Sequence, residues 1–434
     1  MVALTWGVHT ATSQTNFTIL KSFSAIADGR IPWCTLADGK DGALYGTTTV
    51  GGISDSGTVF RINLDGSGFV SLKLFSGPDG AGPFSGLALG ASGELFGTTI
   101  GGGSSNLGTI FRLAKDGGNF RVLHSFTGGT DGIKPQAGLI QGSDGALYGM
   151  ARYVNASNQG TIFRITPDGS GYSIIHTFTG PPDGQQPYGK LLEGSDGRLY
   201  GTTYSGGLFI GTVFSLQKDG SGYWILHNFQ RGDGLSPNAG LLEGSDGFLY
   251  GTTSHGGTLF GGTVFKLNKD GSAYETLHNF PMQGSDYDPS SELVEGADGA
   301  LYGTAWFGAV FKLNKDGSGY ALLQNLGGAT PWGLLSNTNG VIYGETSWGG
   351  LLGVGSVFAL SNGPLPPQLV ALPSSGGTNL LLCAATSGFD YDLLRSTNLA
   401  SWSPLTTVTS TNGGFVFPDV NAPKPAVFYR LLRH

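Results

Sequence analysis

The segment Leu199-Tyr200-Gly201-Thr202 decides the fold of this chain, because it is one of seven versions of the same motif. A repeat of about 50 residues is typical of a β-propeller or a solenoid, in which each unit buries its apolar face against its neighbours. The aromatic residue of the motif recurs at Tyr45, Phe96, Tyr148, Tyr200, Tyr250, Tyr302 and Tyr343.

Each of the first six repeats contains four short apolar runs with an alternating pattern. In the third repeat they span residues 136–141, 146–153, 160–165 and 172–178, with glycine-rich turns between them. An X-Gly pair such as Asp196-Gly197 joins the first two runs, and a segment such as Asp168-Gly169-Ser170-Gly171 joins the last two. Such turns suit tight hairpins. The pattern predicts a four-stranded antiparallel meander in every repeat and an all-β protein.

The two ends of the repeat array predict how the ring closes. The seventh repeat lacks a fourth run, because after Phe358 the chain enters the proline-rich stretch 364–367, which cannot continue a ladder. An extra run at 16–23 precedes the first repeat and matches fourth strands such as 223–229. Pairing this run into the last blade removes an exposed sheet edge. We therefore predict a seven-bladed β-propeller closed by its N-terminal strand.

A smaller all-β part follows the predicted propeller. We assign residues 1–15 to a leader or a remnant of an export signal, 16–361 to the propeller, 362–371 to a proline-rich linker and 372–434 to a C-terminal β-module that resembles a small sandwich. The leader assignment rests on a short apolar start that ends near small residues and lacks a preceding lysine or arginine.

The repeat also resembles a known family. Its order of Asp-Gly-x-x-Pro, Leu-Tyr-Gly-Thr-Thr, Gly-Gly and Gly-Thr-Val-Phe is similar to the GloVer tandem repeat family of secreted bacterial proteins, over residues 16–360. Kelch repeats have a similar length and are the alternative, and they also form propellers. The tail resembles the small β-modules that end exported bacterial proteins. The resemblance implies an extracellular or cell-surface location and an architecture, and it implies no particular activity.

The composition excludes several classes of function. Charged residues form 12% of the chain, the net charge is -7, and the 23 Lys and Arg residues are spread along it, so nucleic acid is not an expected partner. No apolar run is long enough for a membrane span. Cys34 and Cys383 lack metal or redox spacing, and we expect buried thiols rather than a disulfide. We expect a monomer with no metal and no cofactor.

The longer connections between strands should share one face, and that face is where we expect function. The residue after the repeated proline should rim the central channel there. Trp33, Tyr188 and Trp332 stand at this position, and Trp306 lies on a neighbouring loop. We predict that these aromatic side chains bind a ligand beside the polar Asn238 and Asp288. Aromatic faces with polar neighbours suit an extracellular glycan or another ligand. The alternative is that these side chains pack against the neighbouring prolines and glycines.

Two further functions stay open on the sequence alone. Arg152, Tyr153, His255 and Glu345 should lie on the same face, where an arginine and a tyrosine or histidine base suit a polysaccharide lyase or, more broadly, a glycoside hydrolase. A rigid ring could equally be a structural or cell-surface scaffold for another protein. Four histidines share one position of the outer strand and are interpreted as surface residues rather than metal ligands: His124, His176, His227 and His278.

Overall fold

The computed structural model describes residues 16–24, 28–154, 159–207, 210–337, 340–361, 368–373, 379–384, 390–396, 403–409, 414–419 and 428–433. The leader predicted for residues 1–15 and residues 362–367 of the predicted linker lie outside the described residues. The chain divides into two compact units, one spanning Ile19–Ala359 and one that contains the C-terminal module.

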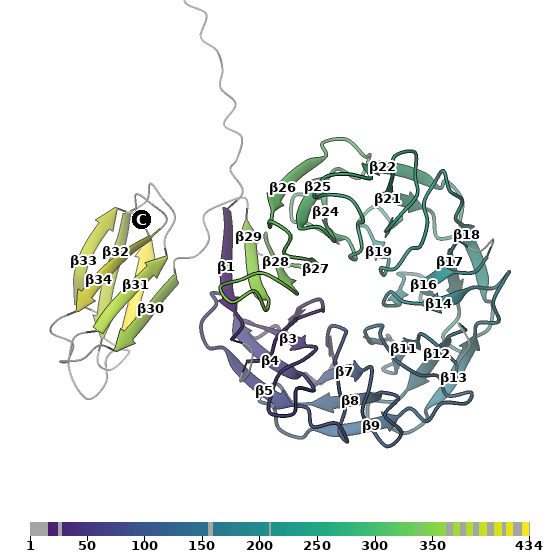
Figure 1. Ribbon diagram of the computed structural model, residues 1–434, viewed down its shortest axis with the longest axis horizontal. Helices are drawn as coiled ribbons and strands as arrows, with labels where there is room; N and C mark the ends of the chain where they lie inside the picture. The colour runs from purple at the N-terminus through teal and green to yellow at the C-terminus, as the bar shows by residue number, and fades with distance from the viewer. Residues whose placement is uncertain are drawn as a thin grey trace, which may run out of the picture. The chain divides into compact units, whose positions relative to one another are not determined.

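The first unit is a ring of seven antiparallel sheets, as predicted (Figure 1). The first three blades are β2 (Ala37–Asp38), β3 (Ala43–Thr48), β4 (Thr58–Asn63) and β5 (Val70–Leu74); β6 (Ala88–Leu89), β7 (Leu95–Thr99), β8 (Thr109–Leu113) and β9 (Arg121–Ser125); and β10 (Ile140–Gln141), β11 (Leu147–Ala151), β12 (Thr161–Ile165) and β13 (Ser173–Thr177).

The next three blades follow the same order around the ring. They are β14 (Gln185–Pro187) with β15 (Leu192–Glu193), β16 (Leu199–Ser205), β17 (Thr212–Leu216) and β18 (Trp224–Asn228); β19 (Leu242–Glu243), β20 (Leu249–Thr253), β21 (Phe260–Leu267) and β22 (Glu275–Pro281); and β23 (Val294–Glu295), β24 (Leu301–Ala305), β25 (Ala309–Leu313) and β26 (Ala321–Asn325).

The seventh blade confirms the predicted closure. It combines β27 (Pro331–Ser336), β28 (Val341–Thr346) and β29 (Ser356–Ser361) with β1 (Asn16–Ser22), in the order β1-β29-β28-β27 (Figure 1). The Phe23 amide donates to the Gly355 carbonyl at 3.1 Å, and the Phe23 side chain is fully buried. The last blade is therefore assembled from both ends of the repeat array, and β1 supplies the fourth strand that the seventh repeat lacks.

Core packing explains why the Leu-Tyr-Gly-Thr motif repeats. Gly201 pairs with Phe214 on the neighbouring strand, and a Cβ atom at Gly201 would lie 2.5 Å from Cζ of that phenylalanine. Only glycine leaves room for the ring. The preceding Tyr200 is buried, and its hydroxyl donates to the Asp196 carboxylate of the hairpin turn at 2.6 Å. In five blades the motif therefore couples the hairpin turn to the core.

The outer-strand histidines join neighbouring blades, so the prediction of plain surface positions needs correction. His227 is partly buried, and its ring stacks on Tyr274 of the next blade with centroids 3.7 Å apart. Its Nε2 lies 3.1 Å from the Asp233 carboxylate, while the Tyr274 hydroxyl donates to the Asp233 carbonyl. His124 makes the same contacts in its blade. The pattern missed this role because the stacking partner lies in another repeat.

The hairpin turns meet on one face of the ring, which we call the turn face. There the backbone amide and hydroxyl of Ser143 donate to the Glu193 carboxylate of the next blade, at 2.8 and 2.6 Å. Lys218 pairs with the same carboxylate. Burial opposes ionisation, but the Lys218 and Ser143 contacts hold the pKa of Glu193 below its usual value. Glu193, Glu243 and Glu295 on this face are thus each paired with a lysine.

The second unit holds two three-stranded sheets. They are β30 (Gln368–Pro373), β31 (Asn379–Ala384) and β34 (Gly414–Asp419), and β33 (Ser403–Thr409), β32 (Asp390–Ser396) and β35 (Phe428–Arg433). Buried Leu381 and Leu393 form a core between the sheets, and Arg395 pairs with Asp419 at 2.9 Å. This arrangement agrees with the sandwich-like module predicted from the sequence.

Candidate functional site

The longer connections lie opposite the hairpin turns, on what we call the loop face. Near the channel the chain makes one more antiparallel contact with the loop after the second strand, for example between Ile133 and Tyr153. In six of the blades the residue before the repeated proline then takes a left-handed conformation, with φ of 53° at Gln186 and 61° at Asp288. Such angles are uncommon for residues other than glycine and carry strain. This backbone turn aims the residue after the proline at the channel mouth.

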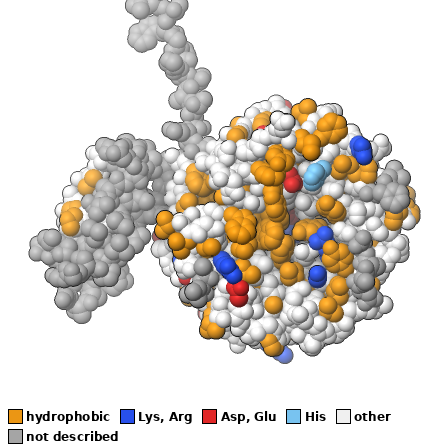
Figure 2. Space-filling view, in the orientation of Figure 1, with side chains coloured by type: hydrophobic (Ala, Val, Ile, Leu, Met, Phe, Trp, Pro, Cys, Tyr) orange, Lys and Arg blue, Asp and Glu red, His pale blue; other side chains and the backbone are white. Residues whose placement is uncertain are grey.

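Aromatic side chains form one side of the channel mouth. The Trp33 ring lies 4.3 Å from Phe84, 5.3 Å from Trp332 and 6.0 Å from Trp306, measured between ring centroids. The contacts are tilted or edge-on, and the three tryptophans are partly exposed. The Nε1 atom of Trp33 is buried and has no hydrogen-bond partner among the described residues. Hydrophobic side chains gather around the middle of the ring in the space-filling view (Figure 2).

Arg152 occupies a second part of the mouth, in the loop where the third blade departs from the repeat. Its guanidinium carbon lies 4.9 Å from the centroid of the Tyr153 ring and 4.7 Å from that of Tyr188. Its terminal nitrogens donate to the side-chain oxygens of Gln136, at 2.9 Å, and of Gln186, at 3.4 Å. Burial raises the pKa of Tyr188, and the positive charge of Arg152 opposes that rise. Uncharged side chains thus hold the guanidinium in a fixed orientation.

A third part of the mouth carries polar side chains of the fifth and sixth blades. The Oδ1 atom of Asn238 is buried and has no hydrogen-bond partner in the part of the chain that the structure describes. His255 is exposed, and its Nδ1 lies 2.9 Å from the Ser254 hydroxyl. Burial raises the pKa of Asp288, although a 2.8 Å hydrogen bond from Ser290 and the nearby His255 oppose the rise.

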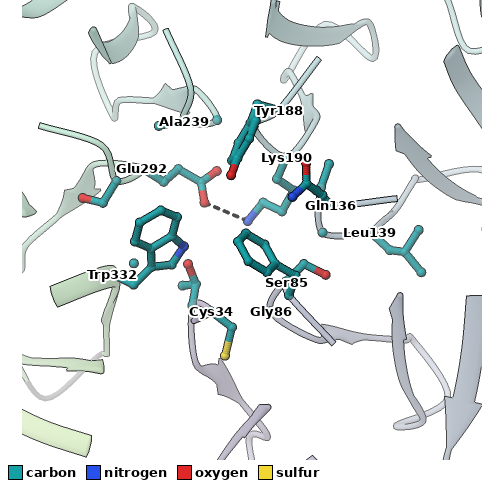
Figure 3. Close-up of a pocket in the computed structure, with 18 of the residues that line it drawn as sticks. Cys34, Ser85, Gly86, Gln136, Leu139, Tyr188, Lys190, Ala239, Glu292 and Trp332 are labelled. Atoms are coloured by element: carbon teal, nitrogen blue, oxygen red, sulfur yellow. Dashed lines mark ion pairs between the residues drawn. The ribbon is translucent and has the colours of Figure 1, made fainter. Parts of the chain in front are cut away.

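A cavity of about 320 Å³ lies below the mouth, lined by the inner strands and their connections. The side chains of Tyr188 and Trp332 point into it, and Lys190 meets Glu292 across it at 3.1 Å (Figure 3). Between these two blades stands Gly240, where a Cβ atom would lie 2.5 Å from Oε1 of Glu292. A side chain at this position of the intervening blade would therefore collide with the ion pair.

Glu345 lies in the interior rather than on the loop face, which corrects its predicted place. Five blades have a threonine at this repeat position, and its hydroxyl donates to a backbone carbonyl of the next blade, as Thr202 does to Ala239 at 2.8 Å. Glu345 instead accepts a 3.0 Å hydrogen bond from the buried thiol of Cys34, a free cysteine. Burial raises the pKa of Glu345 to about 8.

Sequence comparison identifies the family. A model of the Gloeobacter/Verrucomicrobia repeat matches residues 6–210 and 141–358, which together cover most of the chain. The chain belongs to this family. The match confirms the family resemblance drawn from the repeated motif. No curated protein matches this Gloeobacter/Verrucomicrobia repeat protein in sequence.

Solved structures share the fold of this repeat protein at low identity. Catalytically inactive virginiamycin B lyase from Staphylococcus aureus, with quinupristin, is 18% identical with a TM-score of 0.58, over 80% of this chain and 99% of that one. An extracellular domain from B. thetaiotaomicron, of a protein described as a hybrid two-component system, is 11% identical with a TM-score of 0.53, over 96% of this chain and 55% of that one. These matches show a propeller fold and no particular ligand.

Neither a membrane-spanning helix nor a metal-binding group is found among the described residues of the repeat protein. None of its described residues forms a helix long and apolar enough to cross a membrane. No group of three or more His, Cys, Asp or Glu side chains in that part of the chain is arranged to hold a metal ion.

The structure brings together some of the residues singled out in the sequence of this repeat protein. Trp33, Trp306 and Trp332 are in contact with one another. Arg152 contacts both Tyr153 and Tyr188. His255 lies close enough to Asp288 to oppose the rise in the pKa of the Asp288 carboxyl. Glu345 takes no part, because it is fully buried against Cys34.

Sequence reasoning missed the ion pair in the channel and the two glutamines that hold Arg152. A signal for the ion pair was present, because Lys190 and Glu292 stand at a repeat position that is glycine in other blades, such as Gly240. No comparable signal marked Gln186, since its role depends on a left-handed backbone and on an arginine contributed by the preceding blade.

Proposed function

We propose that this protein is a secreted carbohydrate-binding propeller whose ligand enters the channel mouth on the loop face. The observation that carries the proposal is the mouth itself, where aromatic faces stand beside a donor and an acceptor that have no partner among the described residues, Trp33 Nε1 and Asn238 Oδ1. Sugar rings stack on aromatic faces, and their hydroxyls both donate and accept hydrogen bonds. The family resemblance and the extracellular domain with the same fold support secretion.

Native affinity electrophoresis tests the proposal. The purified protein migrates through gels that contain a panel of neutral and acidic polysaccharides, and retardation reports binding. We expect retardation by at least one polysaccharide, and we expect the substitution Trp306→Ala to remove most of it, because a stacking platform is lost. The matched control is Trp224→Ala, since this exposed tryptophan lies on the outer strand β18, away from the mouth. Equal loss in both variants would argue against the mouth as the site.

A polysaccharide lyase is the second candidate, and the contact between Arg152 and Tyr153 favours it. An arginine that neutralises a carboxylate beside a tyrosine suits eliminative cleavage, with Asp288 or His255 as further groups that exchange protons. The electrophoresis experiment separates the two functions if each polysaccharide is also checked for chain length. Shortening of a retarding polysaccharide would establish an enzyme, and retardation without shortening supports a binding module.

A protein-binding scaffold is the third candidate, and exposed apolar side chains on the loops favour it. Ile53 in the first blade is 90% exposed, and Leu351 in the adjacent seventh blade is 87% exposed. Such side chains form interaction surfaces when they cluster. This candidate becomes the leading one if no polysaccharide in the panel retards the protein.

A further inference from the structure

Arg152 is a cation without a carboxylate partner in the part of the chain that the structure describes. Its two hydrogen bonds go to the neutral amides of Gln136 and Gln186, and its Nε atom is buried without a partner. By contrast Arg30, also on the loop face, is paired with Asp55 at 2.9 Å. A guanidinium has five donors in a rigid fork that matches the oxygens of a carboxylate or sulfate. The Arg152 guanidinium keeps donors that its neighbours do not use.

The surroundings of Arg152 hold its guanidinium in place. The rings of Tyr153 and Tyr188 lie within 5 Å of the guanidinium carbon. Tyr188 and Gln136 also line the cavity below the mouth. The side chain is therefore ordered before any ligand arrives, which lowers the entropy cost of binding.

A second cation lies beside the first along the backbone. The Arg152 amide donates to the Lys134 carbonyl at 3.3 Å, and the exposed Lys134 has no ion-pair partner among the described residues. Basic side chains are visible beside the hydrophobic area in the middle of the ring (Figure 2). Lys190 is another cation near the mouth, and its charge is already balanced by Glu292. Arg152 and Lys134 therefore give this part of the rim a positive charge that no described carboxylate pairs with.

We propose that Arg152, with Lys134 beside it, binds the anionic group of an acidic saccharide while the tryptophans of the mouth bind its sugar rings. This inference rests on the proposed function and narrows its ligand class to carboxylated or sulfated glycans. A nucleic acid fits poorly, because its phosphate backbone requires many cations and the chain carries a net charge of -7. One ordered guanidinium beside aromatic faces suits a glycan that carries one negative charge on each sugar unit.

The test compares matched charged and neutral polysaccharides in native affinity electrophoresis. Polygalacturonate is paired with its methyl ester, which keeps the sugar backbone and removes the charge, and dextran sulfate is paired with dextran. We expect strong retardation by a charged member and weak retardation by its neutral partner, with a decline as sodium chloride is added. Comparison of polygalacturonate with dextran sulfate shows whether the bound anion is a carboxylate or a sulfate.

Substitutions assign the effect to Arg152. Arg152→Gln should weaken binding of the charged polysaccharide about ten- to a hundredfold, because charge-assisted hydrogen bonds are lost. Arg30→Gln is the matched control and should leave binding unchanged. Lys134→Gln should weaken binding less than Arg152→Gln does, and it changes only an exposed side chain, so it serves if the Arg152 variant fails to fold. Thermal melts establish whether each variant is folded.

Each outcome decides between the two proposals. Equal binding of a charged polysaccharide and its neutral partner, or full binding by the Arg152→Gln and Lys134→Gln variants, overturns the anion site and leaves carbohydrate binding standing. Retardation by dextran without retardation by dextran sulfate also overturns the anion site and leaves carbohydrate binding standing. No retardation by any polysaccharide overturns both. Retardation by the charged members that is lost in Arg152→Gln and kept in Arg30→Gln supports both.

Discussion

The buried carboxyl of Glu345 should make the propeller less stable as pH rises. In the folded chain the pKa of Glu345 is raised to about 8, because the group is desolvated, although the hydrogen bond from Cys34 opposes the rise. Its usual value is about 4.3. The folded state therefore holds a proton that the unfolded state releases. The corresponding stability is fully present below about pH 4 and is lost as pH rises to about 8.

The substitution Glu345→Gln removes this titration. A carboxyl with a pKa near 8 in the folded state and near 4.3 in the unfolded state loses about 3 to 4 kcal/mol of stability between pH 5 and pH 8. For a ring of this size that loss corresponds to roughly 5 °C in melting temperature. We expect the wild-type melting temperature to fall by about this amount relative to the variant over that pH range, whatever the constant effect of the substitution.

Thermal melts followed by circular dichroism at pH 5, 6, 7 and 8 measure this difference. The control is Glu275→Gln, because Glu275 is largely exposed and pairs with Lys266 on the surface. A melting-temperature difference between wild type and Glu345→Gln that stays constant from pH 5 to pH 8 would refute the reasoning, since it would mean that the Glu345 carboxyl titrates alike in both states.

Three further predictions concern the ring. Deletion of residues 1–24 should lower the melting temperature by about 10 °C or more, since β1 and the buried Phe23 are lost; an unchanged melting temperature would contradict the closure. Gly201→Ala should cost about 1 to 3 kcal/mol in chemical denaturation, and adding Phe214→Leu should recover part of it, because a Cβ atom at Gly201 meets that ring at 2.5 Å. Lys190→Met should destabilise the fold more than the pair Lys190→Met with Glu292→Leu, because the single change leaves a largely buried carboxylate unpaired; equal melting temperatures of the single and the double variant would show that the unpaired carboxylate has no cost.

Much of the candidate site could be located from the repeat pattern, but its contacts could not. The position after the repeated proline placed Trp33, Tyr188 and Trp332 near the channel, because every blade enters its inner strand there. That Tyr188 is one of two rings around Arg152 depends on two neighbouring blades and on a left-handed residue between them. Side chains from separate repeats meet only when the ring has formed.

The predicted place of Glu345 shows the same limit. In the sequence it follows the motif Tyr343-Gly344 and leads into a loop, so a position on the loop face was a reasonable expectation. In the structure it replaces a threonine that points between blades, and it meets a cysteine 311 residues earlier in the chain. The sequence pattern identified the position, but it did not identify the neighbour that makes the position buried.

The sequence by itself determined the number of blades, the hairpins within each blade and the closure by the N-terminal strand. These features depend on residues close together in the chain, or on counting strands, and the core imposes them identically on every repeat. Only the tertiary structure decided which side chains meet at the channel mouth, which charges are already paired and which, like that of Arg152, remain available. Those features depend on contacts between blades, where the repeat is least regular and where each blade adds its own side chain.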